Sequence, residues 1–138
     1  MLFAAPTRGE FPGGNESLLI VDDEAPLRAL LSTALSGKGY TTTEAASGLE
    51  AIELISNPAR SFDAVLLDLN MPGASGTEVL KVIRLCRPDL PVLIISGHIT
   101  TAARAEFQKL GQNDFLQKPY TLDEVGRRIR ARLGATQK

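Results

Sequence analysis

The chain has 138 residues, of which 43% are hydrophobic and 22% are charged, and its formal net charge is −1. A chain of this size can bury one hydrophobic core, and the near-neutral charge excludes a general electrostatic attraction to nucleic acid or to a membrane surface. Cys86 is the only cysteine, which excludes an internal disulfide, and no apolar stretch approaches the roughly 20 residues that span a bilayer. We therefore expect one cytoplasmic domain.

The N-terminal residues 1–17 are rich in proline and glycine and show no hydrophobic periodicity, so we expect a flexible tail or linker there. The domain itself is expected over residues 18–133, with a C-terminal tail at 134–138. Short apolar or threonine-rich runs predict strands at 18–22, 40–44, 64–68, 91–96 and 114–117. Apolar residues at helical spacing predict helices between Pro26 and Gly37, from about Leu49 to Ile55, and at about 77–86, 101–110 and 122–133.

The order of these elements predicts the fold class. Strands alternate with helices along the chain, which is typical of an α/β fold with a parallel sheet covered by helices on both faces. Local signals agree with the helix positions: Pro26 suits a first turn, and Ser47 followed by Glu50 is a capping-box pattern.

Charged and hydroxyl side chains stand at the carboxyl ends of four predicted strands. Asp22 and Asp23 follow the first strand, Asp68 ends the third, Ser96 ends the fourth, and Lys118 follows the fifth. Parallel strands bring these ends to one edge of the sheet, where α/β folds place their ligand sites. Carboxylates crowded at one edge repel one another unless a cation neutralises them, and their oxygen ligands suit Mg²⁺. A neighbouring lysine suggests that a phosphoryl group binds there too.

The simpler interpretation of Asp22 and Asp23 is a helix N-cap, because an aspartate before a first turn accepts backbone N–H bonds. The acidic, basic and hydroxyl groups at three other strand ends favour a ligand site instead.

Four segments resemble the receiver domain of two-component response regulators. They are VDDE (21–24), LLDLNMPG (66–73), IISGH (94–98) and FLQKPY (115–120), and the resemblance extends from about Leu18 to Leu133. It implies a flavodoxin-like, doubly wound, five-stranded parallel sheet of order 2-1-3-4-5 with five helices. It also implies a phosphorelay function in which a histidine kinase or phosphotransfer protein is the partner.

The resemblance assigns a role to each matching residue in the phosphorylation site. Asp68 is implied to be the phosphoacceptor, which attacks the phosphohistidine of the partner. Asp23 and Asp68 are implied to bind Mg²⁺ directly, Asp22 through water, and Asn70 through its backbone carbonyl. Lys118 is implied to pair with the phosphoryl group, and the peptide bond between it and Pro119 is often cis in this family.

Further residues are implied to transmit or time the signal. Ser96 would donate its hydroxyl to a phosphoryl oxygen, and Phe115 occupies the aromatic switch position, where many members have tyrosine. A plain core aromatic is the alternative for Phe115. Asn70 and His98 match the two variable positions that tune the lifetime of the phosphoryl group.

Other functions are less well supported. A phosphohydrolase with an aspartyl-phosphate intermediate commonly has a second aspartate two residues after the nucleophile, where this chain has Asn70. A dinucleotide-binding domain would need GxGxxG after the first strand. We expect a signalling protein rather than an enzyme, although it would promote its own phosphorylation and dephosphorylation. It could be a stand-alone regulator or part of a hybrid sensor kinase.

The last predicted helix carries four arginines, namely Arg127, Arg128, Arg130 and Arg132. They could form a docking surface for an acidic partner or a solvated face that complements the helix C-terminus, and the second interpretation is favoured. Direct recognition of nucleic acid is not expected.

Overall fold

The computed structural model describes residues 11–69, 76–112 and 114–134. Its elements are β1 (Ser17–Val21), α1 (Ala25–Ser36), β2 (Thr41–Ala45), α2 (Gly48–Ser56), β3 (Ala64–Asp68), α3 (Gly76–Cys86), β4 (Val92–Ser96), α4 (Thr101–Lys109), β5 (Phe115–Gln117) and α5 (Leu122–Leu133). Each begins and ends within about one residue of its predicted bounds, because short buried strands and amphipathic helices leave different local periods in a sequence.

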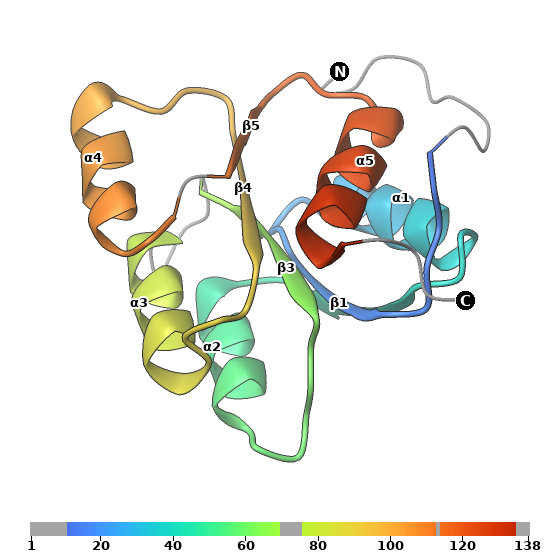
Figure 1. Cartoon of the computed structure of the whole chain (residues 1–138), viewed down its shortest axis with the longest axis horizontal. Coiled ribbons are helices and arrows are strands. Elements are labelled where there is room, and N and C mark those ends of the chain that lie inside the picture. The colour runs from blue at the N-terminus through green and yellow to red at the C-terminus, as the bar shows by residue number, and fades with distance from the viewer. Residues whose placement is uncertain (1–10, 70–75, 113, 135–138) are drawn as a thin grey trace.

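The strands form one parallel sheet of order β2-β1-β3-β4-β5, which confirms the flavodoxin-like α/β fold (Figure 1). Val21 lies beside Leu67, and Asp68 lies beside Ile95. This register brings the carboxyl ends of the central strands to the same level. The side chains that follow them therefore meet at one edge of the sheet.

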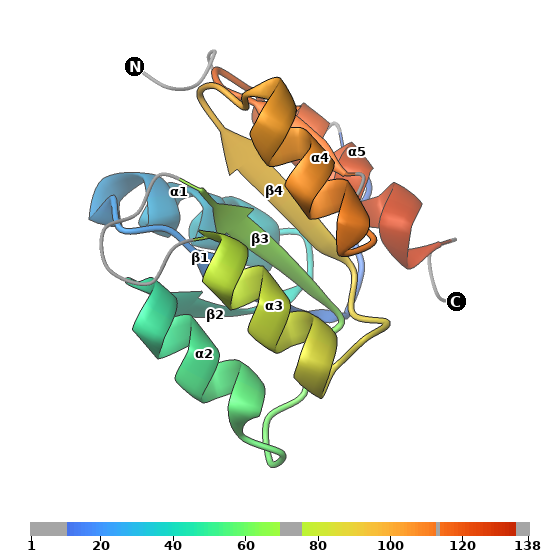
Figure 2. The ribbon, with the colours of Figure 1, turned by 90° about the vertical axis from the view of Figure 1, so that its left-hand side faces the viewer.

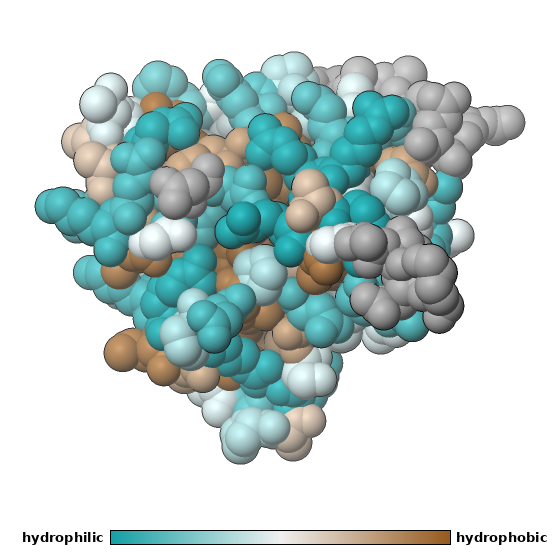
Figure 3. All heavy atoms as spheres, in the orientation of Figure 1, coloured by the Kyte–Doolittle hydropathy of each residue, from teal (hydrophilic) through white to brown (hydrophobic). Residues whose placement is uncertain are grey.

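Helices cover both faces of the sheet. The apolar stripes of α1 and α5 pack with one set of strand residues, and those of α2, α3 and α4 pack with the other. Figure 2 shows α2, α3 and α4 side by side in front of the sheet. The face of the molecule in Figure 3 is mainly hydrophilic. Within the described ranges, no helix is both long and apolar enough to cross a bilayer.

Helix starts agree with the sequence, with one difference. Pro26 lies in the first turn of α1, and the Ser47 hydroxyl accepts a hydrogen bond from Glu50 N–H at 3.1 Å. The Glu50 carboxylate, however, accepts from the N–H of Ala46 instead of that of Ser47. The predicted capping box is therefore closed one residue further back, which still satisfies a free donor ahead of the helix.

The N-terminal segment differs from the expected tail. Residues 11–17 were expected to lie outside the core, yet Phe11 is only 4% exposed and packs with the α1–α5 layer. Gly126 makes this possible, because a β-carbon at that position would stand 2.0 Å from Phe11 Cδ1. The Gly14 N–H also donates to Lys38 O at 3.2 Å. A single aromatic residue without periodic neighbours gave no signal of this burial.

Candidate functional site

The site lies at the carboxyl edge of the sheet, where backbone hydrogen bonds continue beyond the ends of the strands. Asp22 N–H donates to Ala45 O at 3.1 Å, and Lys118 N–H donates to Ser96 O at 2.8 Å. Asp68 is itself the last residue of β3. The backbone beneath these side chains is therefore fixed on two neighbouring strands, which limits where the side chains can reach.

Two of the predicted carboxylates meet at this edge. Asp22 is 4% exposed and Asp68 is 3% exposed. Together with Glu24 they form a group whose carboxylate oxygens all lie within 4.8 Å of one another. Such a group of oxygen ligands suits a hard divalent cation.

Glu24 takes part in this group although the sequence analysis gave it no role. The Asp22 carboxylate accepts a hydrogen bond from Glu24 N–H at 2.9 Å, which turns the chain so that Glu24 faces Asp68. Asp23, implied to be a direct metal ligand, is exposed and is not a member of the group. The acidic run at 22–24 was the available signal, but it could not say which carboxylate turns inward.

The buried carboxylates carry an excess of negative charge. Burial, offset in part by the backbone hydrogen bond from Glu24 N–H and reinforced by the nearby Asp68, raises the pKa of the Asp22 carboxyl to about 6. Burial also raises the pKa of the Tyr120 hydroxyl above its usual range, with the charges of Asp22, Asp68 and Glu24 adding to the effect. A cation bound here would relieve the repulsion at both residues.

Lys118 supplies part of the missing positive charge. Its Nζ lies 3.3 Å from Asp68 Oδ2 and 3.8 Å from Glu24 Oε1, and its side chain is 8% exposed. The peptide bond from Lys118 to Pro119 is cis, in agreement with the resemblance. Lys118 is thus positioned against the Asp68 carboxylate, where its charge could neutralise a phosphoryl oxygen.

Ser96 is fully buried, and its hydroxyl is engaged with the loop that follows β4. It donates to His98 O at 2.9 Å and accepts from His98 N–H at 3.1 Å. The hydroxyl must give up its bond to the carbonyl before it can donate to a group on Asp68. His98 itself is exposed, and Asn70 lies outside the described residues.

Phe115 is a buried aromatic that is covered by a cation. Its ring is 9% exposed and lies 6.1 Å from that of Phe107, centroid to centroid. The guanidinium of Arg104 lies over the ring, with Cζ 4.5 Å from its centroid. A cavity of about 530 Å³ adjoins this pair and is also lined by His98 and Arg128. Both predicted roles of Phe115, switch and core aromatic, are compatible with this position.

The arginines of α5 differ in their surroundings. Arg130 is 7% exposed, and it pairs with Glu16 at 2.6 Å and donates to the Tyr40 hydroxyl at 3.3 Å. Arg127 pairs with Asp123 at 3.6 Å, while Arg128 and Arg132 pair with Asp114 at 3.5 and 2.8 Å. The favoured interpretation of a solvated face is therefore wrong for Arg130, which joins α5 to the segment before β1.

Comparison with known proteins agrees with this geometry. The family model described as the response regulator receiver domain matches residues 18–130. The response regulator MprA of Mycobacterium sp. (strain KMS) is 38% identical over 119 residues, which cover 86% of this chain and 51% of MprA. The chain thus spans about half the length of the curated relatives it matches.

Solved structures share the fold. The receiver domain of Francisella response regulator 1452 has a TM-score of 0.77 at 31% identity, covering 86% of this chain and 97% of that one. The receiver domain of the sensor histidine kinase PA1611 from Pseudomonas aeruginosa PAO1 has a TM-score of 0.77 at 23% identity, with 88% and 100% covered. The PA1611 structure contains a magnesium ion coordinated in its active site cleft.

Proposed function

Because this chain belongs to the family of response regulator receiver domains, we propose that Asp68 is the residue that receives the phosphoryl group. The observation that carries this assignment is the buried Asp68 carboxylate, with Lys118 Nζ 3.3 Å away and the carboxylates of Asp22 and Glu24 beside it. The chain is a signalling protein, and its phosphoacceptor role requires one nucleophile, one charge-compensating cation and a metal site at the same sheet edge.

The proposed reaction is the transfer of a phosphoryl group from the phosphohistidine of a histidine kinase or phosphotransfer protein. A carboxylate oxygen of Asp68 attacks the phosphorus, so that a P–O bond forms as the P–N bond breaks. The electron pair of the broken bond stays on the imidazole nitrogen of the partner. Lys118 balances the charge on the phosphoryl oxygens, and Ser96 turns from His98 to donate its hydroxyl to one of them.

The residues at the site fit Mg²⁺, because all their ligand atoms are oxygens and because burial and charge repulsion act together on Asp22. We propose that Asp68 and Asp23 bind the ion directly, Asp22 through water, and Asn70 through its carbonyl. Glu24 then serves as the resting partner of Lys118. The magnesium ion coordinated in the active site cleft of the PA1611 receiver domain supports the choice of Mg²⁺ as the cation. When bound, Mg²⁺ would supply positive charge beside Asp68 that offsets the charge of the phosphoryl oxygens.

The proposed output is a change of surface. A phosphoryl group that recruits the Ser96 hydroxyl releases the carbonyl of His98, which allows the loop before α4 and the neighbouring Phe115 to rearrange. A downstream protein partner would read that change.

The assignment of Asp68 is tested with acetyl phosphate and Mg²⁺, followed by intact mass. We expect one stable acyl phosphate per chain in the wild type and none in Asp68→Asn. Asp89→Asn is the matched control, because Asp89 is an exposed carboxylate in the loop before β4, at the opposite edge of the sheet. Undiminished labelling of Asp68→Asn would refute the assignment, and repeated release of phosphate without accumulation would indicate a phosphohydrolase.

A further inference from the structure

Helix α4 is attached to the rest of the molecule unequally along its length. Among its residues only Phe107, in its second half, is buried. Figures 1 and 2 show α4 at the outer end of the layer that it forms with α2 and α3. Because so little apolar surface holds this helix, polar contacts at its two ends decide which end can move.

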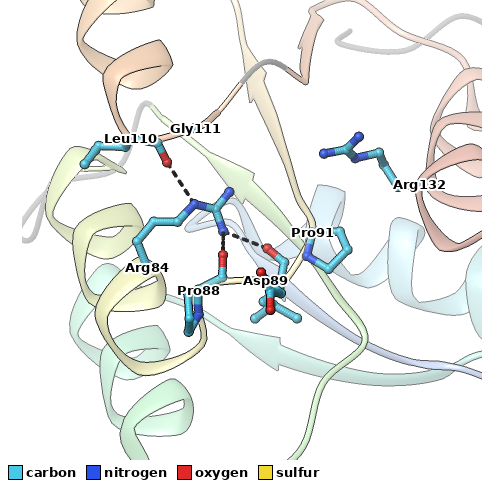
Figure 4. A pocket seen from close by; sticks show the side chains of 8 residues that line it. Arg84, Pro88, Asp89, Pro91, Leu110, Gly111 and Arg132 are labelled. Atoms are coloured by element: carbon cyan, nitrogen blue, oxygen red, sulfur yellow. Dashed lines mark hydrogen bonds between the residues drawn. The ribbon is translucent and has the colours of Figure 1, made fainter.

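The C-terminal end of α4 is fastened by Arg84 of α3 (Figure 4). Its Nε donates to Leu110 O at 3.0 Å, and its Nη2 donates to Gln112 Oε1 at 3.0 Å. Its Nη1 donates to Leu90 O at 2.8 Å and to Pro88 O at 3.5 Å. One rigid guanidinium therefore ties the end of α4 to α3 and to the loop before β4.

Gln112 extends this connection into the sheet. It is 2% exposed, and its Nε2 donates to Val92 O at 2.6 Å and to Asp114 O at 2.8 Å. Its backbone N–H donates to Phe107 O at 3.0 Å. A buried amide whose oxygen and nitrogen are both bonded holds its neighbours in one arrangement, because moving it would leave polar groups unsatisfied.

The N-terminal half of α4 has contacts of a different kind. The loop before it is held by the Ser96 hydroxyl at His98, the bond that a phosphoryl group on Asp68 would draw away. The helix itself is held to β5 by the stacking of Arg104 on Phe115, a contact that leaves the guanidinium free to slide. The cavity of about 530 Å³ beside this stack gives the two side chains room to rearrange.

We propose that α4 pivots about its C-terminal end, with Arg84 and Gln112 as the pivot and the stack of Arg104 on Phe115 as the contact that slides. This inference rests on the proposed function, because the trigger is a phosphoryl group at Asp68. The N-terminal end of α4 then carries the signal. Arg104 holds the Phe115 ring in place by stacking, because this ring has no hydroxyl that could form a hydrogen bond.

Amide hydrogen exchange of the full chain tests the pivot. It is measured with and without Mg²⁺ and beryllofluoride, a stable mimic of the phosphoryl group on Asp68. Ala103 and Arg104 report on the first turn of α4, since their N–H groups bond to Thr100. Leu110, Gly111 and Gln112 report on the other end. We expect exchange to change by roughly tenfold at the first pair and to stay within about twofold at the other three. An equal change at both ends would overturn the proposal.

Substitution at the pivot should make the two ends of α4 respond equally to beryllofluoride in amide exchange. In Arg84→Ala, we expect the amides at 110–112 to respond to beryllofluoride as strongly as those at 103–104. Arg87→Ala is the matched control, because Arg87 also leaves α3 and donates only to carbonyls, those of Ile55, Asn57 and Arg60, none of which belongs to α4. An unchanged pattern in Arg84→Ala, or the same change in Arg87→Ala, would contradict the pivot. If Arg84→Ala does not fold, Gln112→Ala takes its place.

A ¹⁹F signal from bound beryllofluoride distinguishes a failure of the phosphoacceptor site from a failure of the pivot. If no bound signal appears in the wild type, the proposed phosphoacceptor site fails and the pivot fails with it. If the signal appears and exchange along α4 is uniform, the phosphoacceptor site stands and only the pivot is refuted.

Discussion

The buried Asp22 carboxylate lowers the stability of the folded state at neutral pH. Its pKa of about 6 in the folded state lies above the 3.8 of an ordinary aspartate, so between these pH values the folded state binds a proton that the unfolded state has already lost. The contribution of Asp22 to the free energy of unfolding therefore falls as pH rises from about 4 to about 6, and the full cost remains at higher pH. A cation bound at the proposed site would offset this cost.

This cost predicts the effect of a neutral side chain at position 22. In Mg²⁺-free buffer above about pH 7, we expect Asp22→Asn to raise the free energy of unfolding by on the order of 1–3 kcal/mol. Well below pH 3.8 the difference should vanish, because the Asp22 carboxyl is then protonated in both the folded and the unfolded state. Urea unfolding at both pH values measures it, and equal stability of variant and wild type above pH 7 would contradict the raised pKa.

Asp23 and Glu24 compete for the role of third carboxylate. We expect Asp23→Ala to weaken Mg²⁺ binding by roughly tenfold or more, and more than Asp22→Ala does, because a direct ligand contributes more than one acting through water. Glu24→Gln is the control, since Glu24 is half exposed and already lies 3.8 Å from Lys118. Calorimetric titration would decide the matter. A larger loss in Glu24→Gln than in Asp23→Ala would make the observed group of Asp22, Glu24 and Asp68 the metal site.

At the scale of elements, α5 owes its position to a segment that precedes the sheet. Phe11 fills the space left by Gly126, and Lys38 Nζ lies 5.0 Å from the centroid of the Phe11 ring. Arg130 adds hydrogen bonds to Gly13 O at 3.2 Å and to Glu16. The segment and the helix therefore pack as one unit. The effect on stability of a substitution in the segment should depend on which residue stands in the helix, and the reverse should also hold.

A double-mutant cycle tests this unit. We expect Phe11→Ala to lower the free energy of unfolding by about 3 kcal/mol, while Leu85→Ala, at a residue 84% exposed, should have almost no effect. Gly126→Ala should destabilise the wild type through its clash with Phe11. In the Phe11→Ala background the same change should stabilise, by up to about 1 kcal/mol, because alanine is the better helix former. Additive effects would show that the two residues do not touch.

At the scale of the whole molecule, the proposed phosphorylation site brings together residues from separate strands of the sheet. Asp22 follows β1, Asp68 ends the central strand β3, and Lys118 follows the edge strand β5. A ligand that bridges these strands binds the folded chain alone and must stabilise it as a whole.

Magnesium should therefore raise the stability of the entire domain. At about tenfold excess over its Kd, Mg²⁺ is expected to add about 1.4 kcal/mol to the free energy of unfolding. Asp68→Asn should lose most of this increment, and Asp89→Asn should keep it. Thermal unfolding with Mg²⁺ and with EDTA measures the difference. An equal increment in Asp68→Asn would place the ion elsewhere.

Whether a feature could be predicted from the sequence depends on how far apart in the chain the interacting residues lie. The strands, the helices and the strand-end residues Asp22, Asp68, Ser96 and Lys118 could be predicted because hydrophobic period and sequence position are local properties. Periodicity predicted a parallel sheet, and the family resemblance added its order, which the structure confirms. The burial of Phe11 and Arg130 could not be predicted, because the ion pair of Arg130 with Glu16 joins residues 114 positions apart.

The sequence by itself determined which residues face one edge of the sheet and what chemistry they offer, since strand ends and residue types are written in the chain. Only the tertiary structure decided which of the acidic residues turns inward, where the Ser96 hydroxyl rests and which end of α4 is fastened. Those outcomes depend on hydrogen bonds such as that of Arg84 to Gln112, between segments that meet only after the chain has folded. A local pattern carries no information about them.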